Sequence, residues 1–461
     1  MSFFGPAKAE RDAAPAPSDS ASPVLTARQR EPDELAARRP SLLEEKLKVH
    51  SRIIDDFNLS LLDRLPREEL AKHVRMYVAD YVRAENIALN RREVEAFAAE
   101  IVDEMIGYGP IEPLLKDPGV NDILINGHDQ CFVERLGRLY ETKIHFKDEA
   151  HLLRIINKMV AVAGRRVDES APMVDARLPD GSRVNVAVRP VAVDGPIVSI
   201  RKFAAQPLTI ERLVELGSLP PPVVDLLSAA VRGRVSLVVL GGTGSGKTTL
   251  LNALSGFVPE HERLVTIEDA VELRLQRRHV CRMETRPANI EGRGEIRMRD
   301  LVRNALRMRP DRIIVGECRG EEAFDMLQAM NTGHEGSMTT IHANSPRDAL
   351  KRLEQMVGMA DMPMTVASIR GQIAAAIRLL VQVQRLPDGS RRLTSVSEIT
   401  GLDADAIGVQ EIFYFAKEFT DRAGNLKGHF YATGAKPTFL DDVKAFGIDV
   451  PDSHFDPARS L

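Results

Sequence analysis

The sequence contains few cysteines, no long apolar run and no marked excess of charge of either sign. Cys131, Cys281 and Cys318 lie far apart and form no C-x-x-C pair, which is typical of small buried residues in a reducing compartment. No stretch approaches the roughly 18 apolar residues that a membrane span needs, and the first residues lack a charged-then-apolar signal pattern. These absences favour a cytoplasmic enzyme.

The charge balance indicates neither a nucleic-acid partner nor an anionic membrane. Lys and Arg total 62 against 66 Asp and Glu, a net charge of −4, and 44% of the 461 residues are hydrophobic. Residues 274–319 are a local exception, with 13 arginines and six acids. A solvated face is the usual interpretation of such a run, and a subunit contact or channel lining is the alternative. Sparse aromatic residues disfavour a nucleic-acid track there.

Composition and hydrophobic periodicity divide the chain into five segments. Residues 1–40 are rich in Ala, Pro and Ser, which predicts a disordered tail, and residues 41–106 show the apolar stripes of a helical bundle. Residues 107–203 alternate short strands with turn residues, which predicts a smaller α+β domain. Asn126-Gly127 predicts a hairpin there. The sextet LPDGSR at 178–183 recurs at 386–391, which we interpret as the same hairpin chemistry used twice and not as a duplicated domain.

A linker at 204–220 leads into a domain at 221–461, in which strands and helices alternate to about residue 400, as a parallel sheet requires. Ser345, Pro346 and Asp348 there predict the capped start of a helix. Residues 401–461 are mixed and suggest no chemistry.

Residues 241–248 read GGTGSGKT, a complete phosphate loop. An apolar run at 235–240 predicts the strand before it, and Leu250, Leu251 and Leu254 share the face of a helix after it. Glycines let the backbone N–H groups converge on phosphate oxygens at a helix N-terminus. The motif therefore predicts a bound nucleoside triphosphate with Mg²⁺. The residues expected to bind it are Gly242, Thr243, Gly244, Ser245, Gly246, Lys247, Thr248 and Thr249.

Lys247 is expected to reach the β- and γ-phosphates, and the Thr248 hydroxyl to bind Mg²⁺. Two acids follow apolar strands: Glu268 after 264–267 and Glu317 after 312–315. At the carboxyl edge of a parallel sheet, two such acids can hold a divalent ion and orient water. Residue types alone leave open which acid does which, and also leave helix capping as an alternative.

A third strand, expected at 338–341, ends in His342, which could reach the γ-phosphate. His334 precedes the same strand and is equally well explained as a structural histidine. The spacing of the two is not that of metal ligands, so zinc is not expected.

Three segments resemble a known family: 315–323 (VGECRGEEA), 331–334 (NTGH) and 340–345 (TIHANS). They are similar to the secretion ATPases of type II, type IV and pilus systems. Segments 285–292 (TRPANIEG) and 299–310 (RDLVRNALRMRP) narrow the resemblance to the tight-adherence (Tad, CpaF-like) pilus assembly ATPases. The likeness spans about residues 40–450.

The resemblance implies a hexameric ring whose subunits each have a PAS-like α+β domain followed by a RecA-like motor domain. It implies that Glu268 activates water, that Glu317 lies near Mg²⁺, and that His334 and His342 belong to a histidine box with His342 near the γ-phosphate. Arginines of the smaller domain close over the nucleotide in this family. The candidates here are Arg177, Arg183 and Arg201.

The function expected from this resemblance is hydrolysis of ATP, with Mg²⁺, that powers assembly of a tight-adherence pilus. Such systems usually lack a separate retraction motor, which leaves open whether the same enzyme also drives retraction. The partners would be inner-membrane platform proteins, which would bring the enzyme to the cytoplasmic face of that membrane without nucleic acid. The alternatives are a conjugative-type ATPase that translocates nucleic acid or effectors, and a ring that binds nucleotide without hydrolysing it. A GTPase is disfavoured because the sequence has no N-K-x-D motif.

Overall fold

The computed structural model describes residues 67–87, 89–135, 138–202, 208–286, 288, 293–360, 362–404, 406–421, 424 and 426–461. The predicted tail 1–40 and the predicted first helix of the bundle lie outside these residues. The chain divides into two compact units at Pro113 and Leu114. Within the described part, no helix has the length and apolar character needed to cross a bilayer.

The described part of the first unit is a pair of helices, α3 (Arg67–Ala84) and α4 (Arg91–Met105), followed by the short helix η2 (Gly109–Ile111). Val74 and Val78 of α3 pack in one core with Phe97 and Ile101 of α4, which confirms two predicted apolar stripes. Asn90 caps α4 by accepting from the Glu93 amide at 3.0 Å. The next helix, α5 (Glu112–Lys116), continues the chain into the second unit.

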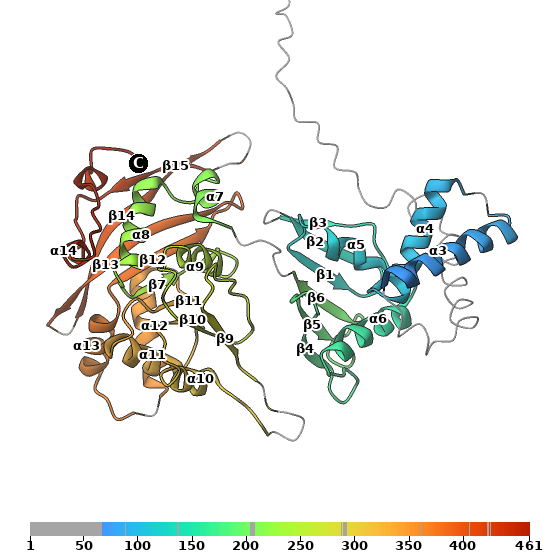
Figure 1. Ribbon diagram of the computed structural model, residues 1–461, viewed down its shortest axis with the longest axis horizontal. Coiled ribbons are helices and arrows are strands. Elements are labelled where there is room, and N and C mark those ends of the chain that lie inside the picture. Colours follow the sequence, from blue (N-terminus) through green and yellow to red (C-terminus); the bar gives the residue numbers. More distant parts are fainter. Residues whose placement is uncertain are drawn as a thin grey trace, which may run out of the picture. The chain divides into compact units, whose positions relative to one another are not determined.

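The second unit begins with a six-stranded antiparallel sheet and the helix α6 (Glu149–Val162) (Figure 1). Its strands run in the order β3-β2-β1-β6-β5-β4. They are β1 (Asp122–Asn126), β2 (Gln130–Arg135), β3 (Arg138–Glu141), β4 (Met173–Arg177), β5 (Arg183–Ala187) and β6 (Ile197–Arg201). The predicted hairpin at Asn126 is confirmed, because β1 and β2 pair antiparallel and Gly127 takes a positive φ of 72°.

The rest of the unit is built on a nine-stranded sheet in the order β15-β14-β13-β12-β7-β11-β10-β8-β9. Six strands pair in parallel: β7 (Leu237–Leu240), β8 (Leu264–Glu268), β9 (Val280–Glu284), β10 (Arg312–Cys318), β11 (Met338–Ile341) and β12 (Leu379–Arg385). The four central strands predicted from sequence are confirmed. Three antiparallel strands extend the sheet: β13 (Arg391–Asp403), β14 (Ala406–Thr420) and β15 (Leu426–Ala432).

This antiparallel extension corrects the sequence-based picture, in which the sheet is parallel and residues beyond 400 have no clear role. The pairing of β13 with β12 adds seven residue pairs, from Leu379 with Glu398 to Arg385 with Arg391. Strands that pair through a tight turn need no crossover helix, so the helix–strand alternation ends at β12. The mixed sheet still belongs to the predicted α/β class, which is confirmed.

Helices cover both faces of the nine-stranded sheet (Figure 1). Leu237 and Val239 of β7 pack into one apolar core, and Val238 and Leu240 pack into the other, as expected for a strand buried on both faces. The helices of this part are α7 (Ile210–Glu215), α8 (Pro221–Arg232), α9 (Lys247–Ser255), α10 (Met298–Ala305), α11 (Glu322–Asn331), α12 (Pro346–Gly358), α13 (Val366–Ala376), α14 (Leu440–Lys444) and η3 (Asp452–Phe455).

Local chemistry predicted from sequence recurs in the structure. Ser345 caps α12 by accepting from the Asp348 amide at 3.1 Å, with Pro346 at the first helical position. The sextet LPDGSR, at 178–183 and 386–391, forms the same turn between β4 and β5 and between β12 and β13. In each turn the leucine amide donates to the serine carbonyl, at 2.9 and 2.8 Å. The repeat is therefore shared hairpin chemistry, as predicted.

Candidate nucleotide site at the carboxyl edge of the parallel strands

The phosphate loop joins β7 to α9 and is packed closely against β12. A Cβ on Gly241 would lie 2.2 Å from the Val383 carbonyl oxygen, so only glycine fits there. Gly246 has a φ of 99° at the N-cap of α9, a left-handed conformation that glycine adopts without strain. These constraints curl the loop over the N-terminus of α9, where backbone N–H groups favour an anion.

Lys247 begins α9, and its side chain is turned back over the loop. The residue is only 9% exposed, and its Nζ donates to the Gly242 carbonyl at 2.9 Å. Burial lowers the pKa of the Lys247 ammonium; the negative charge of Glu317 acts in the opposite direction, and the positive charge of Arg319 adds to the lowering. A poorly solvated ammonium beside converging N–H groups is suited to phosphate oxygens.

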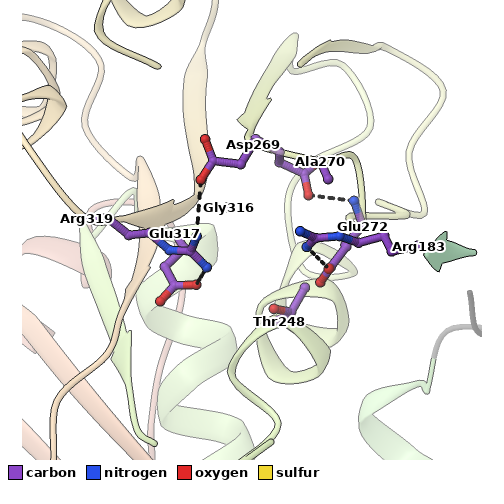
Figure 2. Close-up of a pocket in the computed structure, with 9 residues that line it drawn as sticks. Arg183, Thr248, Asp269, Ala270, Glu272, Gly316, Glu317 and Arg319 are labelled. Atoms are coloured by element: carbon purple, nitrogen blue, oxygen red, sulfur yellow. Dashed lines mark hydrogen bonds and ion pairs between the residues drawn. The ribbon is translucent and has the colours of Figure 1, made fainter. Parts of the chain in front are cut away.

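A pocket lies beside the first turn of α9, at the carboxyl ends of β8 and β10 (Figure 2). Its lining combines one hydroxyl, four carboxylates and two guanidinium groups. The lining residues are Arg183, Thr248, Glu268, Asp269, Ala270, Glu272, Gly316, Glu317 and Arg319. The structure thus brings together Thr248 and both strand-end acids predicted from sequence.

Glu268 is the buried acid of the pocket, with 3% of its surface exposed. Its Oε2 accepts from the Glu272 and Leu273 amides at 2.8 and 2.9 Å, whereas Oε1 is buried without a hydrogen-bond partner. Burial raises the pKa of the Glu268 carboxyl to about 7, although the two amide hydrogen bonds lower it. A pKa near neutrality suits a general base. A Cβ on Gly316 would lie 2.7 Å from Glu268 Cγ, so the glycine admits this side chain.

Glu317 lies near the end of β10 and is bound by Arg319, two residues further along. Arg319 Nη2 donates to Glu317 Oε2 at 2.7 Å, and Nη1 donates to Asp269 Oδ2 at 3.3 Å (Figure 2). The hydrogen bond to Glu317 raises the pKa of the Arg319 guanidinium, and burial opposes this. The Arg319 guanidinium thus links Glu317 and Asp269, two acids at the carboxyl ends of the neighbouring parallel strands β10 and β8.

The three candidate arginines of the six-stranded sheet stand in one row. The register pairs Arg177 with Arg183 and Arg183 with Arg201 across β4, β5 and β6. Like charges in such a row repel one another, and each arginine has an acidic partner that offsets the repulsion. The pairs are Arg177 with Glu284 at 3.2 Å, Arg183 with Glu272 at 2.9 Å, and Arg201 with Asp122 at 3.3 Å. Among them, only Arg183 lines the pocket.

The two histidines lie at opposite edges of the sheet. His342 follows β11 at the carboxyl edge, where β11 lies between β7 and β10, but it does not line the pocket. His334 precedes β11 at the amino edge, beside Gly336, whose amide donates to the Ser236 hydroxyl ahead of β7. The structure therefore does not bring His334 to the phosphate loop. The four residues of β11 separate the two histidines, so that His342, as expected, is the one at the carboxyl edge of the sheet.

The residues of the pocket fit a magnesium-bound triphosphate. Glu268 Oε1, in the pocket lining, is buried without a partner, and so is Ser245 Oγ of the adjacent phosphate loop, whereas buried polar atoms generally have partners. Mg²⁺ prefers oxygen ligands and keeps several waters, so the Thr248 hydroxyl and one carboxylate, Glu317, are sufficient protein ligands. The described residues contain no cluster of three His, Cys, Asp or Glu side chains that could hold a metal ion.

Sequence reasoning assigned no role in the site to Asp269, Glu272 or Arg319, which all line the pocket. Asp269 and Arg319 follow the two strand-end acids by one and two residues, and that proximity was the available signal. Glu272 carried none, because its contact with Arg183 joins residues 89 positions apart.

The family model for type II/IV secretion system proteins matches residues 104–411. The chain belongs to this family. A putative conjugal transfer protein of Mycobacterium tuberculosis is 38% identical over 315 residues, covering 67% of this chain and 89% of that protein. The conjugal transfer protein TrbB of Rhizobium radiobacter is 31% identical over 290 residues, covering 62% of this chain and 86% of TrbB.

A solved structure, the VirB11 ATPase of the Brucella suis type IV secretion system, is 29% identical. The match covers 62% of this chain and 91% of VirB11, with a TM-score of 0.35. The predicted type II/IV secretion family is thus confirmed for this chain by the family model.

Proposed function

We propose that this family member is a Mg²⁺-dependent ATP hydrolase that converts hydrolysis into mechanical work on a secretion or pilus machine. The observation that carries the proposal is the convergence of Thr248, Glu268 and Glu317 beside the phosphate loop. Phosphoryl transfer to water needs phosphate positioning, charge neutralisation and an oriented nucleophile. At this edge of the sheet, Lys247 can position the phosphates, Thr248 and Glu317 can hold the neutralising Mg²⁺, and Glu268 can orient the water.

In this proposal Lys247 and the loop N–H groups hold the β- and γ-phosphates, as the buried position of the ammonium favours. Thr248 and Glu317 hold Mg²⁺, which supplies neutralisation of the phosphate charge. Glu268 accepts a proton from the attacking water at Oε1, the oxygen left free by the Glu272 and Leu273 amides. His342 senses the γ-phosphate from the neighbouring strand end.

The arginine row supplies the mechanical coupling. Arg177 and Arg183 pair with Glu284 and Glu272, acids close to Glu268. We infer that these arginines exchange their carboxylate partners for phosphate oxygens as the reaction proceeds. A guanidinium delivered in this way stabilises transition-state charge, and its delivery requires motion of the sheet that carries it. In a homohexamer, these motions of the arginine-bearing sheet would be coupled between neighbouring subunits around a ring.

Within the family, we propose a tight-adherence pilus motor acting through inner-membrane platform proteins. Segments 285–292 and 299–310 support it, because their sequences resemble that group. The second candidate is a conjugative-type ATPase, favoured by the relatives named as conjugal transfer proteins. Phosphate release measured with and without single-stranded and duplex DNA separates the two. Stimulation severalfold or more would favour the conjugative candidate, and no stimulation the pilus motor.

The enzymatic proposal is tested by phosphate release from the full chain with Mg²⁺ and ATP. Lys247→Ala should abolish release while leaving the fold intact, because the loop loses its only buried ammonium. Lys444→Ala is the matched control, since its ion pair with Asp441 is exposed on the surface. Normal phosphate release from Lys247→Ala would refute the proposal.

A further inference from the structure

Arg319 has no role in the chemistry proposed above, yet it lines the pocket. Two of its guanidinium nitrogens donate to carboxylates at the ends of different strands (Figure 2). These are Glu317, near the end of β10, and Asp269, directly after β8. Glu317 and Arg319 are two residues apart at the end of a strand, so their side chains leave the same face and meet. A guanidinium fork is suited to such a bridge because its donors are fixed in one plane.

The bridge uses an oxygen of Glu317, the carboxylate that is proposed to bind Mg²⁺. Glu317 Oε2 lies 2.7 Å from Arg319 Nη2, a charge-assisted hydrogen bond, and the Glu317 side chain is only 25% exposed. Two cations cannot share one carboxylate edge at contact distance without strong mutual repulsion. The Arg319 side chain is 56% exposed, so it has solvent space into which it can turn.

We propose that Arg319 is a positioning residue that competes with Mg²⁺ for Glu317 and so sets the Mg²⁺ concentration at which nucleotide binds. This inference rests on the proposed function of the pocket. As Mg²⁺ engages Glu317, Arg319 turns away and stays anchored at Asp269, its second partner.

The experiment titrates Mg²⁺ against the full chain at a fixed concentration of a fluorescent, non-hydrolysable ATP analogue. The half-saturating Mg²⁺ concentration is read from bound fluorescence, without turnover. Removing a partly exposed ion-pair partner is worth up to about 1 kcal/mol, so Arg319→Ala should lower that concentration roughly two- to fivefold. Arg319→Lys keeps the charge but cannot bridge two acids, so it should lower the half-saturating Mg²⁺ concentration by a smaller factor than Arg319→Ala.

Arg297→Ala is the matched control, because the exposed ion pair of Arg297 with Glu295 lies outside the pocket lining. Binding of the same analogue in EDTA tests the alternative that Arg319 binds phosphate directly. An unchanged or higher half-saturating Mg²⁺ concentration in Arg319→Ala would overturn the inference. So would an equal loss of nucleotide affinity with and without Mg²⁺. If the unaltered chain itself shows no Mg²⁺-dependent binding, the proposed function fails first.

Discussion

The ionisation of Glu268 gives the sharpest prediction for catalysis. A base must be deprotonated to accept a proton from water, and burial raises the pKa of this carboxyl from 4.5 to about 7. Turnover should therefore rise about tenfold between about pH 6 and about pH 8 at saturating Mg²⁺ and ATP. Glu268→Gln should still bind nucleotide but hydrolyse it at least ~10²-fold more slowly, with no such rise.

The same pKa makes an independent prediction for stability. Because folding raises this pKa, the protonated carboxyl contributes stability that is fully present below about pH 4.5 and is lost as pH rises through about 7. The full shift corresponds to roughly 3 kcal/mol. A glutamine removes the buried charge but leaves a buried amide without a partner, which costs about 1 kcal/mol. Glu268→Gln should thus be about 2 kcal/mol more stable than wild type at about pH 8.

The assay is thermal unfolding of the wild-type protein and of Glu268→Gln at about pH 5 and about pH 8. A gain of 2 kcal/mol raises the midpoint by roughly 4–8 °C at the higher pH in a domain of this size. At about pH 5 the variant should show no gain. Glu335→Gln, at an exposed position, is the control and should leave the difference between the two pH values unchanged. An equal midpoint difference between wild type and Glu268→Gln at both pH values would refute a buried, ionising Glu268.

Three further substitutions test the geometry. Arg183→Ala should lower turnover on the order of 10³-fold in steady-state phosphate release with nucleotide binding retained, and near-normal turnover would remove Arg183 from the chemistry. Gly316→Ala places a Cβ 2.7 Å from Glu268 Cγ and should reduce hydrolysis about 10²-fold; unchanged hydrolysis would contradict the packing. Gly336→Ala forces a φ of 79° on alanine and crowds Arg312 at 2.7 Å, so calorimetry should show a loss of about 2–3 kcal/mol.

Short-range patterns predicted the core of the site. The phosphate loop, the strand ends at Glu268 and Glu317 and the Ser345 cap depend on residues close in sequence, and the structure has them at the expected places. Both LPDGSR turns were predictable for the same reason, because glycine and aspartate define the turn locally.

Long-range pairing produced what the sequence could not predict. The antiparallel strands after residue 390 join the sheet by pairing with β12 and with one another. The alternation of apolar and polar residues along one strand does not reveal which strand it pairs with. The arginine row has the same origin, since Arg177, Arg183 and Arg201 become neighbours only through pairing. The raised pKa of Glu268, at the end of β8, follows from burial, and its side chain lies against Gly316 of the neighbouring strand β10, a contact that no single segment specifies.

The most direct test of the account is a structure of the full chain with Mg²⁺ and a non-hydrolysable ATP analogue. The account predicts a terminal phosphate held by Lys247, a magnesium ion between Thr248 and Glu317, and a water between that phosphate and Glu268. A triphosphate bound with Glu268 and Glu317 both remote from its terminal phosphate would contradict it.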